Sequence, residues 1–327
     1  MSAAIEIGGA QFELRDLGRN DRAALIGLHR EVFGEGASDG WYVWKYVQGH
    51  GLGSGLWHDG RLVAHCGGVP RALWQEGERR TGIQIGDVMV APQWRGVLTR
   101  RGPFFHVSQK FYDGHVGSEH AVAFGFPSER HLRLAVKTQL LWDGGPVHSL
   151  SWMTAHAPAP GWAWRWEPLD AGSPAFDSAI ASAWSNMQAE CGRFVVGERN
   201  ADYVRWRFFR RPGRHHAAFA LRRAWSRAVR GVAILDLAQP TAHWLDWIGR
   251  PSDMPLACTC CRAQAHAAGA QYLTAWATPA VAQSLAPSGI LHSEVTAWLG
   301  IPRRSQLAEA DVGRLAWWLM GGDTDFL

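Results

Sequence analysis

Two arginine–glycine pairs, Arg95-Gly96 and Arg101-Gly102, lie in one loop and are the residues best suited to bind an anion. Pro103 follows the second pair and favours the start of a helix, because the amide that proline lacks would be unpaired there anyway. A glycine- and arginine-containing loop that leads into a helix offers free backbone N–H groups and the positive end of the helix dipole. The ligand that suits this arrangement is a phosphate or a pyrophosphate.

The residues before the loop predict the strand that must position it. Residues 83–90 alternate apolar side chains, as a half-buried strand does, and Pro92 then starts the loop. A nucleoside-triphosphate site is disfavoured, because the loop contains no G-x-x-x-x-G-K-[ST] sequence. A Rossmann site is disfavoured too, because no G-x-G-x-x-G follows the strand.

The strand and loop together have a specific resemblance. Val88-Met89-Val90-Ala91-Pro92, followed by Gln93-Trp94-Arg95-Gly96, resembles the acyl-CoA loop of the GNAT acyltransferase superfamily. In that family V-x-V-x-P precedes [QR]-x-x-G-x-[GA]. Leu98 departs from the pattern, which usually has Gly or Ala there. Either Arg-Gly pair, or a longer loop that uses both, could therefore be the pyrophosphate cradle.

The resemblance implies a cofactor site and its residues. In the family the central strands splay, and the pantetheine arm hydrogen-bonds to the exposed backbone, a role that falls here to Met89 and Val90. The loop amides would hold the pyrophosphate. The cofactor-binding residues expected on this basis are Met89, Val90, Arg95, Gly96, Val97, Leu98, Arg100, Arg101, Gly102 and Ser128. The expected cosubstrate is acetyl-CoA or another acyl-CoA, and no metal is expected.

The segment after the first helix supports the same resemblance. Residues 120–127 predict a buried strand, and Ser128 is a suitable N-cap for a helix that runs to about Thr138. The family often carries a tyrosine in this helix, which protonates the CoA thiolate. That position falls near Ala135 here, so the usual general acid is unassigned.

Acyl transfer to an amine also needs a base, since most of the amine is protonated at neutral pH. Asp87 is the best carboxylate candidate, because it lies on the strand that would present the thioester. The structural alternative is that Asp87 pairs with an arginine such as Arg71 or Arg95. His120 and His131 are alternative bases near the expected cleft.

The chain repeats a pattern of its own. An aromatic-x-x-Trp-basic-aromatic sequence occurs at 41–46 and again at 203–208. Each copy precedes two strands, an Asp-containing strand that ends before a proline, a helix and a further strand, which indicates a duplicated unit. The second copy reaches Pro251 without an Arg-Gly pair, so one acyl-CoA site is expected. Asp246 is equivalent to Asp87, which favours a structural role for both.

This repeat and a Pro/Ala/Gly-rich stretch suggest the domain organisation. We expect an acyl-CoA-binding domain over 1–153, a linker over 154–175 and a degenerate second domain over 176–327. The implied fold class is α/β (α+β), with two GNAT-like domains that each hold a mixed, splayed central sheet flanked by helices. Such a chain is long enough for two cores.

Arginine dominates the basic residues, with 30 arginines and 3 lysines at a net charge of +4. Ten of the arginines lie between Arg199 and Arg230, where Asp202 is the single acid. They form either a polyanion-binding patch or a surface whose arginines pair with carboxylates elsewhere. No nucleic-acid motif accompanies them, so the sequence argues against nucleic acid as a partner.

The cysteines and the hydropathy set the expected compartment. Five cysteines without a framework pattern favour a reducing cytoplasm, and Cys258-Thr259-Cys260-Cys261 lies in an expected amphipathic helix, where buried cysteines act as small hydrophobes. No stretch approaches the ~18 apolar residues of a membrane-spanning helix, so no membrane association is expected.

The function expected from the resemblance is transfer of an acyl group from acyl-CoA to a primary amine of a small molecule or an amino sugar. Two alternatives remain open at this point. One is a non-catalytic acyl-CoA-binding or interaction module of the same fold. The other is a tandem-GNAT aminoacyl transferase, for which the second-half arginines would matter; such enzymes generally lack a CoA loop.

Overall fold

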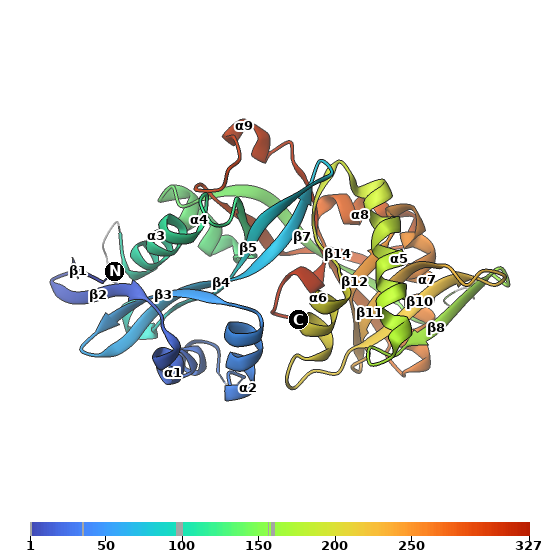
Figure 1. Cartoon of the computed structure of the whole chain (residues 1–327), viewed down its shortest axis with the longest axis horizontal. Helices are drawn as coiled ribbons and strands as arrows, with labels where there is room; N and C mark the ends of the chain where they lie inside the picture. The colour runs from blue at the N-terminus through green and yellow to red at the C-terminus, as the bar shows by residue number, and fades with distance from the viewer. Residues whose placement is uncertain (1, 35, 96–100, 156, 158–160) are drawn as a thin grey trace. The chain divides into compact units, whose positions relative to one another are not determined.

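A computed structural model describes residues 2–34, 36–95, 101–155, 157 and 161–327 of the chain. These residues form two compact units (Figure 1). Unit 1 comprises Met1–Ala72, Arg80–Gly144 and Trp298–Gly313. Unit 2 comprises Leu73–Arg79, Gly145–Ala297 and Arg314–Leu327. Each unit has its own apolar core.

Unit 1 is built on a mixed sheet in the order β1-β2-β3-β4-β5-β6. Its strands are β1 (Ala3–Ile7), β2 (Ala10–Asp16), β3 (Leu52–His58), β4 (Arg61–Gln75), β5 (Glu78–Val90) and β6 (Val122–Phe124). β1 to β4 pair antiparallel, whereas β5 and β6 pair parallel. The helices are α1 (Arg22–Phe33), α2 (Asp39–Tyr42), α3 (Pro103–His115), α4 (Glu129–Lys137) and the short α9 (Glu309–Val312).

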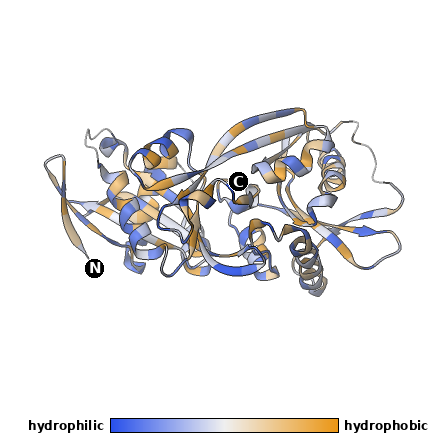
Figure 2. Cartoon of the chain, turned by 90° about the horizontal axis from the view of Figure 1, so that it is seen from above, coloured by the Kyte–Doolittle hydropathy of each residue, from blue (hydrophilic) through white to orange (hydrophobic). Residues whose placement is uncertain are grey.

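Helix α3 follows the loop between Pro92 and Gly102 that the sequence predicts to bind an anion, which we call the anion loop. It begins at Pro103, as the sequence predicts, and packs on β2 and β3. Val107, Ser108, Phe111 and Tyr112 are buried on one side of it, with the i, i+4 spacing of an amphipathic helix. Apolar and polar segments interleave along the strands as well (Figure 2). The apolar faces therefore hold the start of α3 against the sheet.

Unit 2 is built on a second mixed sheet, in the order β14-β7-β13-β12-β11-β10-β8. Its strands are β7 (Leu141–Met153), β8 (Trp164–Leu169), β10 (Ala217–Arg223), β11 (Val229–Asp236), β12 (Thr241–Gly249), β13 (Tyr272–Ala277) and β14 (His292–Pro302). β9 (Phe194–Gly197) and β15 (Ala316–Trp318) pair parallel with each other, and β9 pairs antiparallel with Leu73 and Trp74 at the end of β4. The helices are α5 (Pro174–Cys191), α6 (Ala201–Val204), α7 (Met254–Ala267) and α8 (Pro279–Leu285). In the described part of the chain, no helix combines the length and hydropathy needed to cross a membrane.

The repeated sequence motif has a repeated local structure. Ser38 caps α2 by accepting a hydrogen bond from Trp41 N–H, and Asn200 caps α6 by accepting one from Tyr203 N–H. Each short helix then widens into a π-helical turn, at Val43–Gln48 and Arg205–Phe209. Three strands, a helix, a parallel strand and a second helix follow in both series. The order of elements thus repeats along with the sequence pattern.

The compact units are discontinuous, unlike the continuous segments 1–153 and 176–327 expected from the sequence. Gly125, just after β6, bonds in both directions with Gly300 of unit 1 (3.0 and 2.9 Å). In unit 2, β13 pairs with the later part of β7. The expected linker 154–175 contains β8, and its residues 156 and 158–160 lie outside the described residues.

The cysteine-rich segment forms the buried side of α7, which confirms the structural prediction. Cys258, Cys260 and Cys261 are at most 1% exposed and pack in the core of unit 2. Burial raises the pKa of the Cys258 and Cys260 thiols to about 12. These thiols are therefore protonated at neutral pH and act as small apolar groups.

Candidate functional site

The sheet of unit 1 splits at the predicted cofactor strand. β5 pairs with β6 from Gly82–Val122 to Gln84–Phe124, where β6 ends, while β5 continues to Val90. Trp298 N–H donates to the carbonyl of Pro127, so the chain after β6 pairs elsewhere (3.0 Å). The end of β5 therefore has a backbone edge that β6 leaves unpaired.

One carbonyl on this open edge can be assigned. Ala91 N–H donates to the Val63 carbonyl of β4 (2.8 Å). The carbonyl of Val90 belongs to the same planar peptide and points the opposite way, towards the edge that β6 leaves. It accepts a hydrogen bond from Arg95 Nε (2.8 Å). The structure thus brings together two of the residues predicted to bind the cofactor.

Two helix starts lie near Arg95. Ser128 is the N-cap residue of α4, as predicted, and Gly102 is the N-cap residue of α3. His131 of α4 stacks on Phe104 of α3, with ring centroids 6.2 Å apart. Burial lowers the pKa of His131, and the charges of Arg130 and Arg95 lower it further. Cationic side chains and two helix N-termini therefore meet beside the open edge, and both favour an anion.

Of the other residues predicted to bind the cofactor, Arg101 and Met89 are described by the structure and the rest are not. Arg101 lies at the start of α3, with its guanidinium over the ring of Phe105 at 4.9 Å. Met89 is buried in the core beneath the strand, and only its backbone can serve a ligand. The predicted residues Gly96, Val97, Leu98 and Arg100 lie outside the described residues.

Asp87 lies on β5 past the split, and its surroundings correct the expected arginine partner. Its carboxylate is buried, with Lys45 Nζ at 2.7 Å from Oδ2, and Tyr46 Oη donates to the same oxygen at 2.6 Å. The sequence suggested Arg71 or Arg95 instead. Lys45 and Tyr46 come from the π-helical turn that follows α2. In the sequence this turn is visible only as part of a repeat, although π-helical turns often mark functional sites.

The backbone of Asp87 is strained. Its φ is 50°, in the left-handed region that non-glycine residues rarely adopt, at a cost on the order of 1 kcal/mol. His65 Nδ1–H donates to the Asp87 carbonyl at 2.7 Å and helps to hold this conformation. The imidazole lies flat against Gly53 and Gly67, where an added Cβ would come within 2.5 and 2.6 Å of the ring. Packing and hydrogen bonding together therefore maintain the strained residue.

His65 makes the stability of the protein depend on pH. Burial lowers its pKa to about 4, so the folded protein holds it neutral, while the unfolded chain binds a proton near pH 6.5. We expect the free energy of unfolding to fall by about 3 kcal/mol as the pH drops from about 6.5 to about 4. Chemical denaturation at several pH values measures this.

A His65→Gln variant should flatten that slope, and the exposed His292→Gln serves as its control. His216, whose pKa burial also lowers to about 4, adds a second contribution of the same sign, so the slope should shrink and not vanish. An unchanged slope in His65→Gln would contradict the assignment.

The two candidate histidines lie at different places. His131 lies beside the loop, as described above. His120 follows α3 and bonds to the carbonyl of His115 through its backbone, at the end of the helix away from the loop. A helix of 13 residues is about 20 Å long. His120 is thus not brought to the split edge.

Asp246 of unit 2 has a different environment from Asp87. Arg199 bonds both of its carboxylate oxygens at 3.2 Å and also contacts Asp323 at 2.6 Å. All three side chains are buried, and the backbone of Asp246 is not in the left-handed region. The hydroxyl of Tyr46 has no equivalent, because Phe208 stands at that position of the repeat. The second series therefore keeps the acid in an ordinary buried ion-pair network.

A segment of unit 2 also occupies the place where its strands separate. β12 pairs with β13 from Thr241–Tyr272 to His243–Thr274. Beyond that point Met320 pairs with Ala277 of β13, and Gly322 packs so closely on β12 that an added Cβ would lie 3.1 Å from the Leu245 carbonyl. Residues 319–323 therefore lie against both strands. The gap between β12 and β13, which we call the wedge of unit 2, is thus filled by the chain itself; the wedge of unit 1 is the gap between β5 and β6.

Five of the ten arginines in the second-half cluster form described ion pairs with acids of unit 2. The ion pairs are Arg205–Asp177 (2.6 Å), Arg230–Asp253 (2.9 Å), Arg222–Glu167 (3.5 Å) and Arg214–Asp236 (3.8 Å), besides those of Arg199. This pairing supports the structural explanation of the cluster over a polyanion-binding patch.

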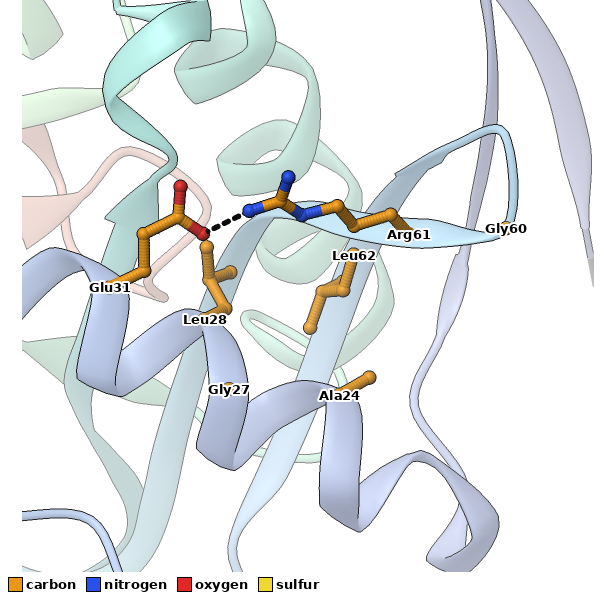
Figure 3. A pocket seen from close by; sticks show the side chains of 7 residues that line it. All are labelled: Ala24, Gly27, Leu28, Glu31, Gly60, Arg61 and Leu62. Carbon is orange, nitrogen blue, oxygen red and sulfur yellow. Dashed lines mark hydrogen bonds and ion pairs between the residues drawn. The ribbon is translucent and has the colours of Figure 1, made fainter.

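A separate pocket of about 610 Å³ lies between α1 and the turn from β3 to β4 (Figure 3). Arg61 and Glu31 form an ion pair of 2.7 Å across it. Its other lining residues are Ala24, Gly27, Leu28, Gly60 and Leu62. None of the described residues predicted to bind the cofactor lines it, so it is a different feature from the split edge.

The fold defines the class of the protein: a mixed α/β protein with two sheets flanked by helices. Residues 13–133, from β2 into α4, match the family model described as an acetyltransferase (GNAT) domain. This region contains Asp87 and the whole anion loop. A search of curated proteins found no match.

Solved structures share the fold over most of the chain. A conserved protein of unknown function from Enterococcus faecalis V583, described as a probable N-acyltransferase, is 13% identical with a TM-score of 0.66, over 89% of this chain and 71% of that chain. A GCN5-related N-acetyltransferase from Anabaena variabilis ATCC 29413 is also 13% identical at 0.66, over 89% and 72%. One from Kribbella flavida is 16% identical at 0.60, over 88% and 70%. At these identities the similarity is one of fold.

Proposed function

We propose that this chain is an acyl-CoA-dependent N-acyltransferase, which uses acetyl-CoA or another acyl-CoA and acts on a primary amine of a small molecule or an amino sugar. The observation that carries the proposal is the split between β5 and β6, with Arg95 and the starts of α3 and α4 beside it. An open strand edge suits the amides of a pantetheine arm, and the helix starts suit a pyrophosphate.

The roles proposed for the residues are those that the family resemblance implies. The backbone of Met89 and Val90 would form hydrogen bonds with the amides of the pantetheine arm. In the structure Arg95 Nε donates to the Val90 carbonyl, which is the acceptor that a pantetheine amide would use. The pyrophosphate would be held by Arg95, Gly96, Val97, Leu98, Arg100, Arg101, Gly102 and the α4 start at Ser128. Acyl-CoA supplies the thioester carbonyl that the amine attacks, and Asp87 is the proposed source of base catalysis.

We further propose that the two series are copies of one unit, spanning 1–153 and 176–327 and joined by 154–175. In this proposal the second copy has no cofactor site. It lacks an Arg-Gly loop after Pro251, and residues 319–323 fill its wedge. The expected stoichiometry is one acyl-CoA per chain, which isothermal titration calorimetry measures.

Ligand binding should raise the melting temperature by mass action. At 100 times the dissociation constant, acetyl-CoA, longer acyl-CoAs or free CoA should add about 2.7 kcal/mol of stability. No shift in a thermal melt at millimolar ligand would refute the cofactor site.

Bulky replacements then locate the cradle. Gly96→Leu and Gly102→Leu should separately weaken the shift, the larger loss marking the Arg-Gly pair that holds the pyrophosphate. Gly114→Leu is the matched control, since it lies on the same helix as Gly102 and an added Cβ meets nothing within 4 Å. Survival of binding in both loop variants would show that the loop is not the site.

One observation favours a second candidate, a non-catalytic acyl-CoA-binding module. Ala135 stands where the family often has its acid tyrosine, and it is fully buried. A thermal shift without release of free CoA in the presence of any amine tested would support the module over the enzyme.

A further inference from the structure

Four side chains of unit 1 form one hydrogen-bonded cluster at the split edge, which we name the Asp87 cluster: Asp87, Lys45, Tyr46 and His65. Three of its four described members are buried, whereas Tyr46 is partly exposed. Tyr46 is therefore the member of the cluster best placed to exchange a proton with a ligand.

We propose that Tyr46 is the general acid–base of the acyltransfer, with Asp87 as the proton acceptor behind it; this inference rests on the proposed function. The 2.6 Å contact from Tyr46 Oη to Asp87 Oδ2 is a short, charge-assisted hydrogen bond, which is the geometry for moving a proton between two oxygens. Lys45 supplies the counter-charge that keeps a carboxylate acceptable at a buried position.

The proton path balances over one turnover. The amine gives its ammonium proton to solvent before it attacks. As the neutral nitrogen then attacks the thioester carbonyl, Tyr46 takes the proton that the nitrogen loses, and the phenolic proton of Tyr46 passes to Asp87. When the carbon–sulfur bond breaks, Asp87 returns a proton through Tyr46 to the departing thiolate. A carbon–nitrogen bond has formed, one proton has moved from nitrogen to sulfur, and the cluster ends as it began.

The second series serves as an internal comparison. It keeps the π-helical turn, the basic residue and the buried acid, but it has Phe208 in place of Tyr46 and no left-handed backbone at Asp246. The tyrosine hydroxyl and the aspartate with a strained backbone thus occur together in the series that has the anion loop. Backbone strain is characteristic of functional positions.

His65 and the aromatic neighbours position the relay. His65 is neutral at physiological pH, because burial lowers its pKa to about 4, and it holds the Asp87 carbonyl without adding charge. The ring of Tyr46 stacks on Tyr42 at 5.4 Å and meets Trp41 edge-on at 5.6 Å. These contacts hold the ring of Tyr46 in place, so that its hydroxyl stays directed at Asp87.

The test is a Tyr46→Phe variant assayed with acetyl-CoA and glucosamine or a simple alkylamine, with release of free CoA as the readout. Loss of general acid–base catalysis should lower kcat about 100-fold or more. The KM for acetyl-CoA and the thermal shift with acetyl-CoA should stay within about twofold of wild type, since the cofactor contacts are elsewhere. The ring itself is tolerated at this position, as Phe208 shows in the equivalent turn.

Tyr272→Phe is the control, because it removes a hydroxyl from an exposed tyrosine of unit 2 that the relay does not use, and it should retain wild-type kcat. A kcat of Tyr46→Phe within threefold of wild type, with binding intact, would overturn the relay and leave the proposed function standing. Loss of acetyl-CoA binding in Tyr46→Phe would also overturn it, by assigning Tyr46 to binding. If wild type itself shows neither a thermal shift nor turnover, the proposed function fails, and the relay with it.

Discussion

Replacing Asp87 with asparagine is expected to lower the free energy of unfolding by about 3–5 kcal/mol. The side chains of Lys45 and Asp87 are only 3% and 7% exposed, so the change leaves a buried ammonium without its counter-charge. Asparagine tolerates the left-handed backbone and is nearly the same size, which leaves charge as the main difference. Denaturant unfolding of the purified protein measures the loss.

An exposed lysine–aspartate ion pair with the same N–O distance provides the control. Lys110 Nζ and Asp16 Oδ2 are also 2.7 Å apart, but their side chains are 24% and 42% exposed. Lys110→Met should therefore cost no more than about 1 kcal/mol. The double variant Lys45→Met with Asp87→Asn should recover part of the loss, because no unpaired charge remains. A single Asp87→Asn cost below 1 kcal/mol would show that the Asp87 cluster does not hold a charged lysine.

The second large effect is expected from Arg199→Met in unit 2, which should lower the free energy of unfolding by about 3–5 kcal/mol or more. Arg199 is fully buried between Asp246 and Asp323, and these two carboxylates hold its pKa above the ordinary value. Without the guanidinium, two buried carboxylates face each other with no cation between them. The effect should concentrate on the segment that carries Asp323.

Local unfolding of that segment gives the sharper readout. Hydrogen exchange of residues 319–324 should accelerate in Arg199→Met well beyond that of the core helix α5, because Arg199 ties Asp323 to β12. Arg199→Lys should be intermediate, since lysine keeps the charge but loses the forked geometry. Arg205→Met, whose partner Asp177 is 58% exposed, is the control and should cost less than about 1 kcal/mol. Uniform exchange across unit 2 would contradict a local role.

Much of the local structure follows from local signals. Pro103 at the start of α3, Ser128 at the cap of α4 and the strand over residues 122–124 were all predictable, because capping and apolar alternation act over a few neighbouring residues. The aromatic-x-x-Trp-basic-aromatic repeat likewise corresponds to a repeated helix with a π-helical turn. The π-helical turn itself was not predicted, since it differs from an α-helix only in hydrogen-bond register.

The partners of Asp87 could not be predicted in the same way. Lys45 and Tyr46 are adjacent in sequence, and adjacent helical residues do not face the same direction. Both nevertheless reach Oδ2 of Asp87, because the strained backbone directs the carboxylate towards the widened turn. Tyr46 and Asp87 lie 41 residues apart in the chain, so no local pattern records their contact.

By itself the sequence predicted most of the elements, an anion-binding loop and the resemblance to one acyltransferase family, since propensity, capping and short motifs depend on neighbouring residues. The tertiary structure alone decided which strands pair across the chain, and so which wedge is open. β6 leaves β5 to pair with residues near Gly300, while residues 319–323 fill the equivalent place in unit 2. Strand pairing satisfies backbone groups with partners of any sequence, so its choice depends on the packing of distant segments.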